Sequence, residues 1–231
     1  MSNQPKHSSP APASSSFIDK LSKLFGGLDM SWKHVIIFAV GIGVFVGLIN
    51  QVPVLEETSF RDIAVSFEWW VLFAFLIVTN CKSGLEAAAK CFVFFLISQP
   101  LIYLVEIPTL GFALGMSYWT TTWLPATFLT LPGGFIAYYA KKQNALGAVI
   151  LGLAGAILAI VSMHYLSVMF SPISFAPFPR HLLTVLFCFA AIALMNIGIQ
   201  KKGNMRALSL AITIVATVAF DGYCILNGLN I

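Results

Sequence analysis

A long apolar run from Trp123 to Phe170, interrupted only by a Lys-Lys-Gln-Asn turn, most limits what this chain can fold into. Each half has about the length of a membrane-crossing helix, which needs roughly 20 apolar residues. Neither half shows the two-residue alternation that is typical of a membrane β-strand. Because backbone groups in lipid must be satisfied internally, the run predicts two transmembrane helices joined by a basic turn.

The composition extends this prediction to the whole chain of 231 residues. Hydrophobic residues make up 58% of it and charged residues only 10%, and the mean hydropathy is +0.88. A soluble domain of this size needs more polar surface. We therefore expect an all-α, polytopic integral membrane helical bundle, with the lipid bilayer as its main partner, in a cell membrane and most simply a bacterial plasma membrane.

The chain is expected to divide into a tail and a membrane domain. Residues 1–16 are rich in Ser, Pro and Ala and predict a disordered tail. Residues 17–30 carry apolar side chains on one helical face and predict an amphipathic helix at the membrane interface. Residues 31–231 form the membrane domain. Seven segments within it are predicted to span the bilayer: 34–50, 63–80, 85–106, 121–140, 145–170, 181–200 and 207–226.

The basic residues predict the orientation of these seven segments. Eleven of the 13 lysines and arginines fall on one side, and only Arg61 and Arg180 fall on the other. Cytoplasmic loops carry an excess of lysine and arginine, so we expect a cytoplasmic N-terminus and an external C-terminus. Basic clusters in short loops are explained by this topology, and nucleic acid is not an expected partner. Lys82, Lys142 and Lys202 recur at intervals of sixty residues, which reflects either a repeated hairpin or simply the length of two spans with their loops.

Small residues predict close contacts between helices. Gly43 and Gly47 are four residues apart in the first segment, and Ala148, Gly152 and Ala156 repeat the same spacing in the fifth. Such spacing lets two helix backbones approach each other. We expect the fifth segment to pack in this way, with the fourth as a candidate neighbour.

Polar groups inside apolar segments are the candidates for a binding site. An acidic side chain at the centre of a membrane helix costs roughly 2.5 to 3.5 kcal/mol, so it is expected to face a cavity or a partner. The candidate solute-binding residues are Asp221, Glu68, His164, Glu106, Gln99, Pro132, Gly133 and Gly134. For Asp221 the alternative is an acid that reaches the headgroups, and for His164 a hydrogen-bonded residue near a helix end.

Pro132, Gly133 and Gly134 fall near the centre of the fourth segment. Proline removes one helical hydrogen bond and clashes with the preceding turn, so this segment is expected to expose backbone groups at mid-membrane depth. Transporters bind substrates and ions at broken helices of this kind. The alternative is a passive kink.

The sequence Glu56-Glu57-Thr58-Ser59-Phe60-Arg61 has the form E-E-x-x-F-R. It resembles the first signature motif of the CAAX-processing type of intramembrane metalloproteases. The resemblance implies a glutamate that activates water and histidines on later helices that complete the site. It covers these six residues alone, since no F-x-x-x-H sequence follows. The alternative is a solvated, charged loop.

Other catalytic motifs do not occur in the sequence. A phosphate-binding loop, a serine elbow, an H-E-x-x-H zinc motif and an N-glycosylation sequon are all missing. The four cysteines show no paired spacing that would predict a metal site or a disulfide framework. No metal or other cofactor is therefore expected, and enzymatic activity is the less favoured interpretation.

These features favour a small solute transporter or a membrane-embedded solute-binding subunit. Its partners would be a small solute and either a membrane partner subunit or a second copy of the chain. The irregular apolar segments at 108–119 and 171–179 would cover the site. The alternatives are a protease-like membrane enzyme and a membrane scaffold without a solute pathway.

Overall fold

The structure is a computed structural model that describes residues 13–120 and 123–227, and all regular structure in these ranges is helical. The helices are α1 (Ala13–Leu24), α2 (Trp32–Asn50), η1 (Pro53–Leu55), α3 (Ser59–Val65), α4 (Glu68–Thr79), α5 (Gly84–Leu110), α6 (Phe112–Gly115), α7 (Ser117–Thr120), α8 (Trp123–Ala137), η2 (Tyr138–Lys141), α9 (Ala145–Phe170), α10 (Leu182–Ile199) and α11 (Gly203–Leu226). The prediction of an all-α chain is confirmed.

Five of these helices are long and apolar enough to cross a membrane: α2, α5, α9, α10 and α11. They match the first, third, fifth, sixth and seventh predicted segments. The second and fourth segments contain the shorter helices α4 and α8. A multi-pass membrane protein is therefore supported, while a total of seven spans stays a prediction.

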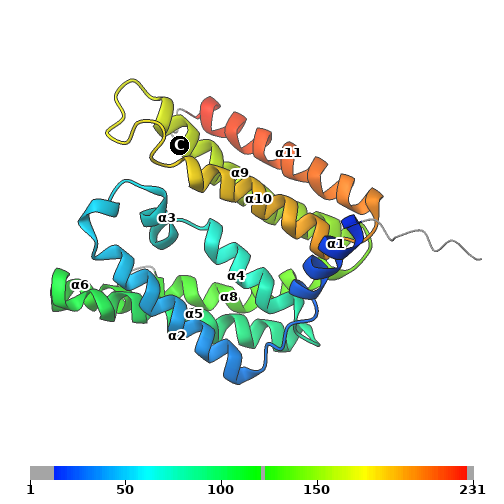
Figure 1. Cartoon of the computed structure of the whole chain (residues 1–231), viewed down its shortest axis with the longest axis horizontal. Coiled ribbons are helices and arrows are strands. Elements are labelled where there is room, and N and C mark those ends of the chain that lie inside the picture. Colours follow the sequence, from blue (N-terminus) through cyan, green and yellow to red (C-terminus); the bar gives the residue numbers. More distant parts are fainter. Residues whose placement is uncertain (1–12, 121–122, 228–231) are drawn as a thin grey trace, which may run out of the picture.

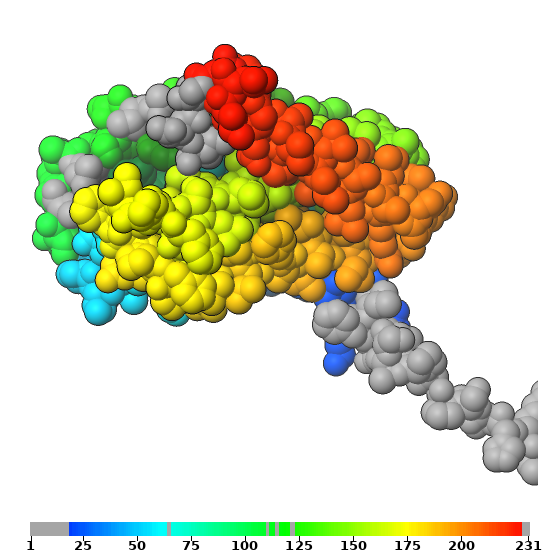
Figure 2. All heavy atoms as spheres, turned by 90° about the horizontal axis from the view of Figure 1, so that it is seen from above, coloured from blue at the N-terminus to red at the C-terminus, as the bar shows by residue number. Residues whose placement is uncertain are grey.

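The helices form two layers (Figure 1). In one layer α5 packs between α2 and α8, and in the other α9 packs between α10 and α11. Helix α4 lies between the layers and contacts α5, α9 and α10. Figure 2 shows α11, in orange and red, on the surface formed by α9 and α10.

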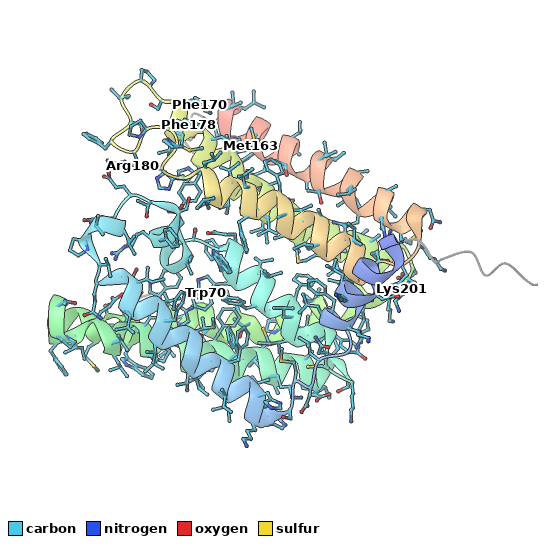
Figure 3. All side chains as sticks on the ribbon, in the orientation of Figure 1. Trp70, Met163, Phe170, Phe178, Arg180 and Lys201 are labelled. Carbon is cyan, nitrogen blue, oxygen red and sulfur yellow. The ribbon has the colours of Figure 1, made fainter. Side chains whose placement is uncertain are left out.

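Two adjacent tryptophans explain how α4 joins the layers. Successive helical residues point about 100° apart, so Trp69 and Trp70 face different neighbours. Trp69 stacks on Phe187 of α10 with ring centres 4.0 Å apart. Trp70 lies against Phe95 of α5, at 5.8 Å, in the interior of the molecule (Figure 3).

Glycines produce the closest helix contacts. A Cβ atom at Gly43 would lie 2.8 Å from the Ser98 carbonyl oxygen, and one at Gly152 would lie 2.7 Å from the Ser209 carbonyl oxygen. Both distances are shorter than normal contacts, so only glycine permits α2 to approach α5 and α9 to approach α11 in this way. The neighbour of the small-residue face on α9 is α11, whereas α8 was the candidate from the sequence.

The three basic turns lie together at one end of the molecule, called the basic end here and defined by Lys82, Lys141, Lys142, Lys201 and Lys202. Three side chains donate hydrogen bonds to the carbonyl oxygens of residues sixty positions earlier in the chain. Lys90 Nζ donates to Met30 (2.6 Å), Lys141 Nζ to Cys81 (2.6 Å) and Gln200 Nε2 to Ala140 (2.7 Å). The opposite end, called the far end, carries Arg61 and Arg180. Figure 3 shows Lys201 and Arg180 at these two ends.

Helix α1 docks on the basic end through the residues that follow it. Phe25 is buried, and its ring lies where a Cβ on Gly198 of α10 would be. Asn80 donates to the Leu24 carbonyl oxygen at 2.9 Å and accepts from the Leu28 amide at 2.7 Å. The helix begins at Ala13, inside the segment predicted to be disordered. The rest of that predicted tail, residues 1–12, lies outside the described residues.

Candidate functional site

The second apolar segment is interrupted between α3 and α4. Ser66 has an extended backbone with φ −114° and ψ 165°, and α4 begins only at Glu68. At 1.5 Å per residue α4 alone is about 18 Å long, too short to cross the roughly 30 Å hydrocarbon core. Helix interruptions of this kind place backbone and polar groups inside a membrane protein, where they line cavities.

A cavity of about 690 Å³ lies beside this interruption. Ser66, Phe67, Trp70, Val71 and Ala74 line it from the α3–α4 side. Helices α5 and α8 provide most of the other walls. On α5 the lining runs from Cys91 to Glu106, which corresponds to about 22 Å along the helix axis. The cavity is therefore elongated and follows α5 toward the far end.

The far end of the cavity is polar. Glu106 is buried and accepts a hydrogen bond from Asn50 Nδ2. Arg61, which also lines the cavity, donates to the Asn50 carbonyl oxygen. The Asn50 Oδ1 atom is buried and has no partner. With the side-chain amide oriented in this way, the Glu106 carboxylate and Asn50 Oδ1 form an acceptor-rich pocket end.

The middle of the cavity combines aromatic rings with hydroxyl and amide groups. Phe67, Trp70, Phe95 and Trp123 supply the rings, and Thr130 and Gln99 supply polar groups between them. The Gln99 amide makes no hydrogen bond to any described residue. The residue is half-buried and lines the cavity, so its amide is available to a bound molecule.

The predicted break at Pro132 is not a break in the structure, because α8 continues through it from Trp123 to Ala137. Gly133 lines the cavity, and a Cβ there would meet nothing within 4 Å. Gly134 also lines the cavity and packs on α5, where a Cβ would lie 2.9 Å from Cys91 Cβ. Pro132 itself is exposed and lies outside the lining. The interruption occurs in the second segment instead.

A second cluster of polar groups lies on the other side of the interruption. Asp62 and His181 are buried, and His181 Nδ1 lies 2.8 Å from Asp62 Oδ2. The Thr184 hydroxyl donates to the same oxygen. The His181 ring stacks on Tyr165 of α9 with ring centres 4.7 Å apart. This cluster fastens α3 to the beginning of α10 and to α9.

Glu68 is fully buried and belongs to this cluster. Its Oε1 atom lies 2.7 Å from the Ser66 hydroxyl, and its Oε2 atom has no hydrogen-bond partner. Ser66 also lines the cavity. Glu68 is therefore separated from the cavity by a single hydroxyl group.

The eight candidate residues fall into three groups in the structure. Gln99, Glu106, Gly133 and Gly134 line the cavity, and Glu68 lies behind Ser66. Pro132, His164 and Asp221 lie elsewhere. The His164 side chain is exposed on α9, and Asp221 is half-exposed on α11. Asp221 and His164 therefore do not line the cavity along α5, and α11, which carries Asp221, packs on α9.

The E-E-x-x-F-R motif lies at the far end, where its first three residues form a loop and its last three begin α3. The Glu57 carboxylate forms an ion pair with Arg180 at 2.9 Å, and the Glu56 side chain is exposed. Across the described ranges, no three His, Cys, Asp or Glu side chains are grouped closely enough to hold a metal ion. This geometry gives the metalloprotease hypothesis no support.

Several cavity residues were missed by sequence reasoning. Asn50 and Tyr103 look like ordinary polar residues near the ends of apolar segments, and Trp70 looks like an interfacial tryptophan. Ser66 gave no signal, because a single serine does not usually interrupt a helix. The spacing of Gln99, Tyr103 and Glu106 at i, i+4 and i+7 would have placed all three on one face of α5.

Comparison of the chain with protein-family models, with curated proteins and with solved structures finds no match. The function is therefore inferred from the geometry of the cavity.

Proposed function

We propose that this multi-pass membrane protein binds a small amphipathic solute in the cavity between α4, α5 and α8, as a transporter or as the solute-binding subunit of one. The cavity itself carries the proposal. Its volume of about 690 Å³ lies within the range of roughly 300 to 1,000 Å³ that is typical of small-molecule sites.

The shape and lining favour a particular kind of solute. The cavity is elongated, and its walls are mostly apolar around Trp70 and Phe95. Binding sites that combine such walls with a few placed polar groups bury an apolar body and orient it by hydrogen bonds. An elongated molecule with an apolar body matches this lining better than a compact ion.

The polar end of the solute would lie at Glu106 and Asn50. Both residues line this end of the cavity, and the Glu106 carboxylate is an oxygen acceptor, so the expected matching group on the solute is a hydrogen-bond donor such as an amine or a hydroxyl. Gln99 would bind a second polar atom near the middle. Arg61 lies beside Glu106 and Asn50 at this end of the cavity. Its positive charge would disfavour the binding of a second cation there.

The proposal is tested by ligand-induced thermal stabilisation of the purified full chain in lipid nanodiscs. A panel of amphipathic amines and alcohols should contain compounds that raise Tm in a concentration-dependent way. Glu106→Gln and Gln99→Leu should weaken that shift at least tenfold in compound concentration. Uptake of a stabilising compound into proteoliposomes then distinguishes a transporter from a binding subunit that needs a partner.

A matched pair of glycine variants provides the control. A Cβ atom at either Gly133 or Gly41 would meet no atom within 4 Å, but only Gly133 lines the cavity. Gly133→Leu should therefore abolish the thermal shift, whereas Gly41→Leu should retain it. Equal shifts in both variants would show that the compounds bind elsewhere, and the cavity would lose its role.

A further inference from the structure

The Ser66 hydroxyl at the α3–α4 interruption lies within hydrogen-bond distance of two acceptors but has only one proton to donate. It lies 2.6 Å from the Asp62 carbonyl oxygen and 2.7 Å from Glu68 Oε1. A hydroxyl donates one hydrogen bond only, while an ionised carboxylate and a carbonyl can only accept. One of these two short contacts therefore lacks a hydrogen atom unless Glu68 supplies it.

The surroundings of Glu68 also disfavour its ionised form. The side chain is fully buried, and Oε2 has no hydrogen-bond partner. In the described part of the chain, no lysine or arginine forms an ion pair with it. A buried carboxylate without a cation or a full set of donors is strongly unfavourable, whereas the neutral acid needs fewer partners.

Titratable neighbours of Glu68 lie on three of the helices around it. They are Asp62 on α3, Tyr165 on α9, and Cys188 and His181 at α10. Asp62 Oδ2 is already engaged by His181 and Thr184. The remaining unpartnered acceptor of the cluster is Glu68 Oε2, so Glu68 is the group that can gain or lose a proton without breaking the Asp62–His181 contact.

We infer that Glu68 is a reversible proton-binding site that sets the hydrogen bonding of the α3–α4 interruption. In the protonated state Glu68 donates through Oε1 to Ser66 Oγ, and Ser66 donates to the Asp62 carbonyl oxygen. On release of the proton to water, the Ser66 hydroxyl turns to the carboxylate, and the Asp62 carbonyl oxygen keeps only the hydrogen bond from the Ser66 amide, at 2.9 Å. One proton is exchanged, and apart from the Glu68 O–H bond no covalent bond forms or breaks.

The link to the cavity is direct. Ser66 lines the cavity and holds the last turn of α3 through the Asp62 carbonyl oxygen. Loss of the hydroxyl hydrogen bond would leave the Ser66 amide as the one remaining donor to this oxygen and would weaken the junction beside Phe67 and Trp70, which form the cavity wall. Intramembrane carboxylic acids serve as proton relays in transporters. The use of this proton in solute binding rests on the proposed function, but the protonation of Glu68 does not.

Infrared difference spectroscopy tests the protonation without any solute. Spectra of the purified full chain in lipid nanodiscs are recorded as the pH is raised. The native protein should show the C=O stretch of a protonated carboxylic acid that disappears on deprotonation. Glu68→Gln should lack this band, and Glu56→Gln, which alters an exposed acid, should keep it. A band that persists in Glu68→Gln, or that is missing from the native protein at every pH, overturns the inference.

A second variant keeps the test decisive if Glu68→Gln does not fold. Ser66→Ala removes the hydrogen-bond acceptor of the acid but leaves Glu68 in place. The band should then move to higher frequency, as the acid loses its partner. An unchanged frequency overturns the inference. Neither result depends on a bound solute, so failure of the thermal-shift screen and failure of the protonation site are separate outcomes.

Discussion

Lys141 Nζ lies 2.6 Å from the Cys81 carbonyl oxygen and 3.9 Å from the centre of the Tyr138 ring. Lys141 lies at the turn between α8 and α9, and its ammonium group therefore caps the turn between α4 and α5. A carbonyl oxygen near a helix C-terminus carries partial negative charge, which a lysine neutralises. The Lys141 side chain thus has a structural role beyond its contribution to membrane orientation.

Lys141→Met should lower the free energy of unfolding by about 1 to 2 kcal/mol, because it removes a charge-assisted hydrogen bond and a cation–π contact. Thermal unfolding in detergent micelles measures the effect. Lys202→Met removes the same charge from an exposed side chain at the same end and serves as the control. Equal losses in the two variants would mean that charge alone, and not the bond to Cys81, stabilises this end.

Gly43→Ala and Gly41→Ala should have opposite effects although both change the same helix. The new methyl group at Gly43 would lie 2.8 Å from the Ser98 carbonyl oxygen, while at Gly41 it would meet nothing within 4 Å. Overpacking of this kind costs about 1 to 3 kcal/mol, whereas alanine in an open helical position stabilises by roughly 0.5 to 1 kcal/mol. Chemical unfolding of both variants in the same micelle checks the sign of each change.

Asp62→Asn should destabilise the protein by about 3 kcal/mol, since it leaves a buried His181 without its carboxylate partner. Glu57→Gln removes an acid of the same far end that pairs with Arg180, but both side chains are nearly half exposed, at 46% and 48%. Exposed ion pairs contribute about 1 kcal/mol or less. Thermal unfolding should rank the two variants in this order, and a reversed ranking would contradict the role given to the buried cluster.

The native cysteines should stay unlabelled by a membrane-impermeant maleimide in intact cells. All four are buried, and burial raises the pKa of the Cys81 thiol to about 11. At pH 8 roughly one Cys81 thiol in a thousand would be a reactive thiolate, and in the expected orientation this thiol lies on the side of the membrane that the reagent does not reach.

This low background allows the orientation to be tested directly. Lys202→Cys should be protected from the reagent until the cells are opened, while Glu56→Cys should react from outside. Both positions are exposed. The reverse pattern would invert the orientation expected from the basic residues.

Long apolar runs were the most informative part of the sequence. The run 145–170 is a helix between the same two residues in the structure, Ala145–Phe170. Asn144 caps it by accepting from the Gly147 amide at 3.1 Å, which explains why a residue with a short polar side chain marks its beginning. The residues that begin and end α9 lie in the apolar run itself or next to it in the sequence, so both ends of this helix could be predicted.

The cavity could be predicted only in part, because its boundaries depend on contacts between distant segments. Pro132 is a strong local signal, yet α8 tolerates it, since a single missing hydrogen bond can be accommodated within a packed helix. The actual interruption at Ser66 depends on Asp62 meeting His181 across 119 positions. No local pattern in residues 59–68 contains that information.

The row of bridged turns at the basic end has a mechanical consequence. Carbonyl oxygens of successive hairpins are tied together there by Lys90, Lys141 and Gln200, whereas α3 and α4 meet at an interruption nearer the far end. The basic end is thus joined by bonds between turns, whereas the far end is joined by the Asp62–His181 contact beside the interruption. For the solute of the proposed function, the polar cavity end at Asn50 and Glu106 lies away from these bridged turns, so entry and exit are expected at the far end.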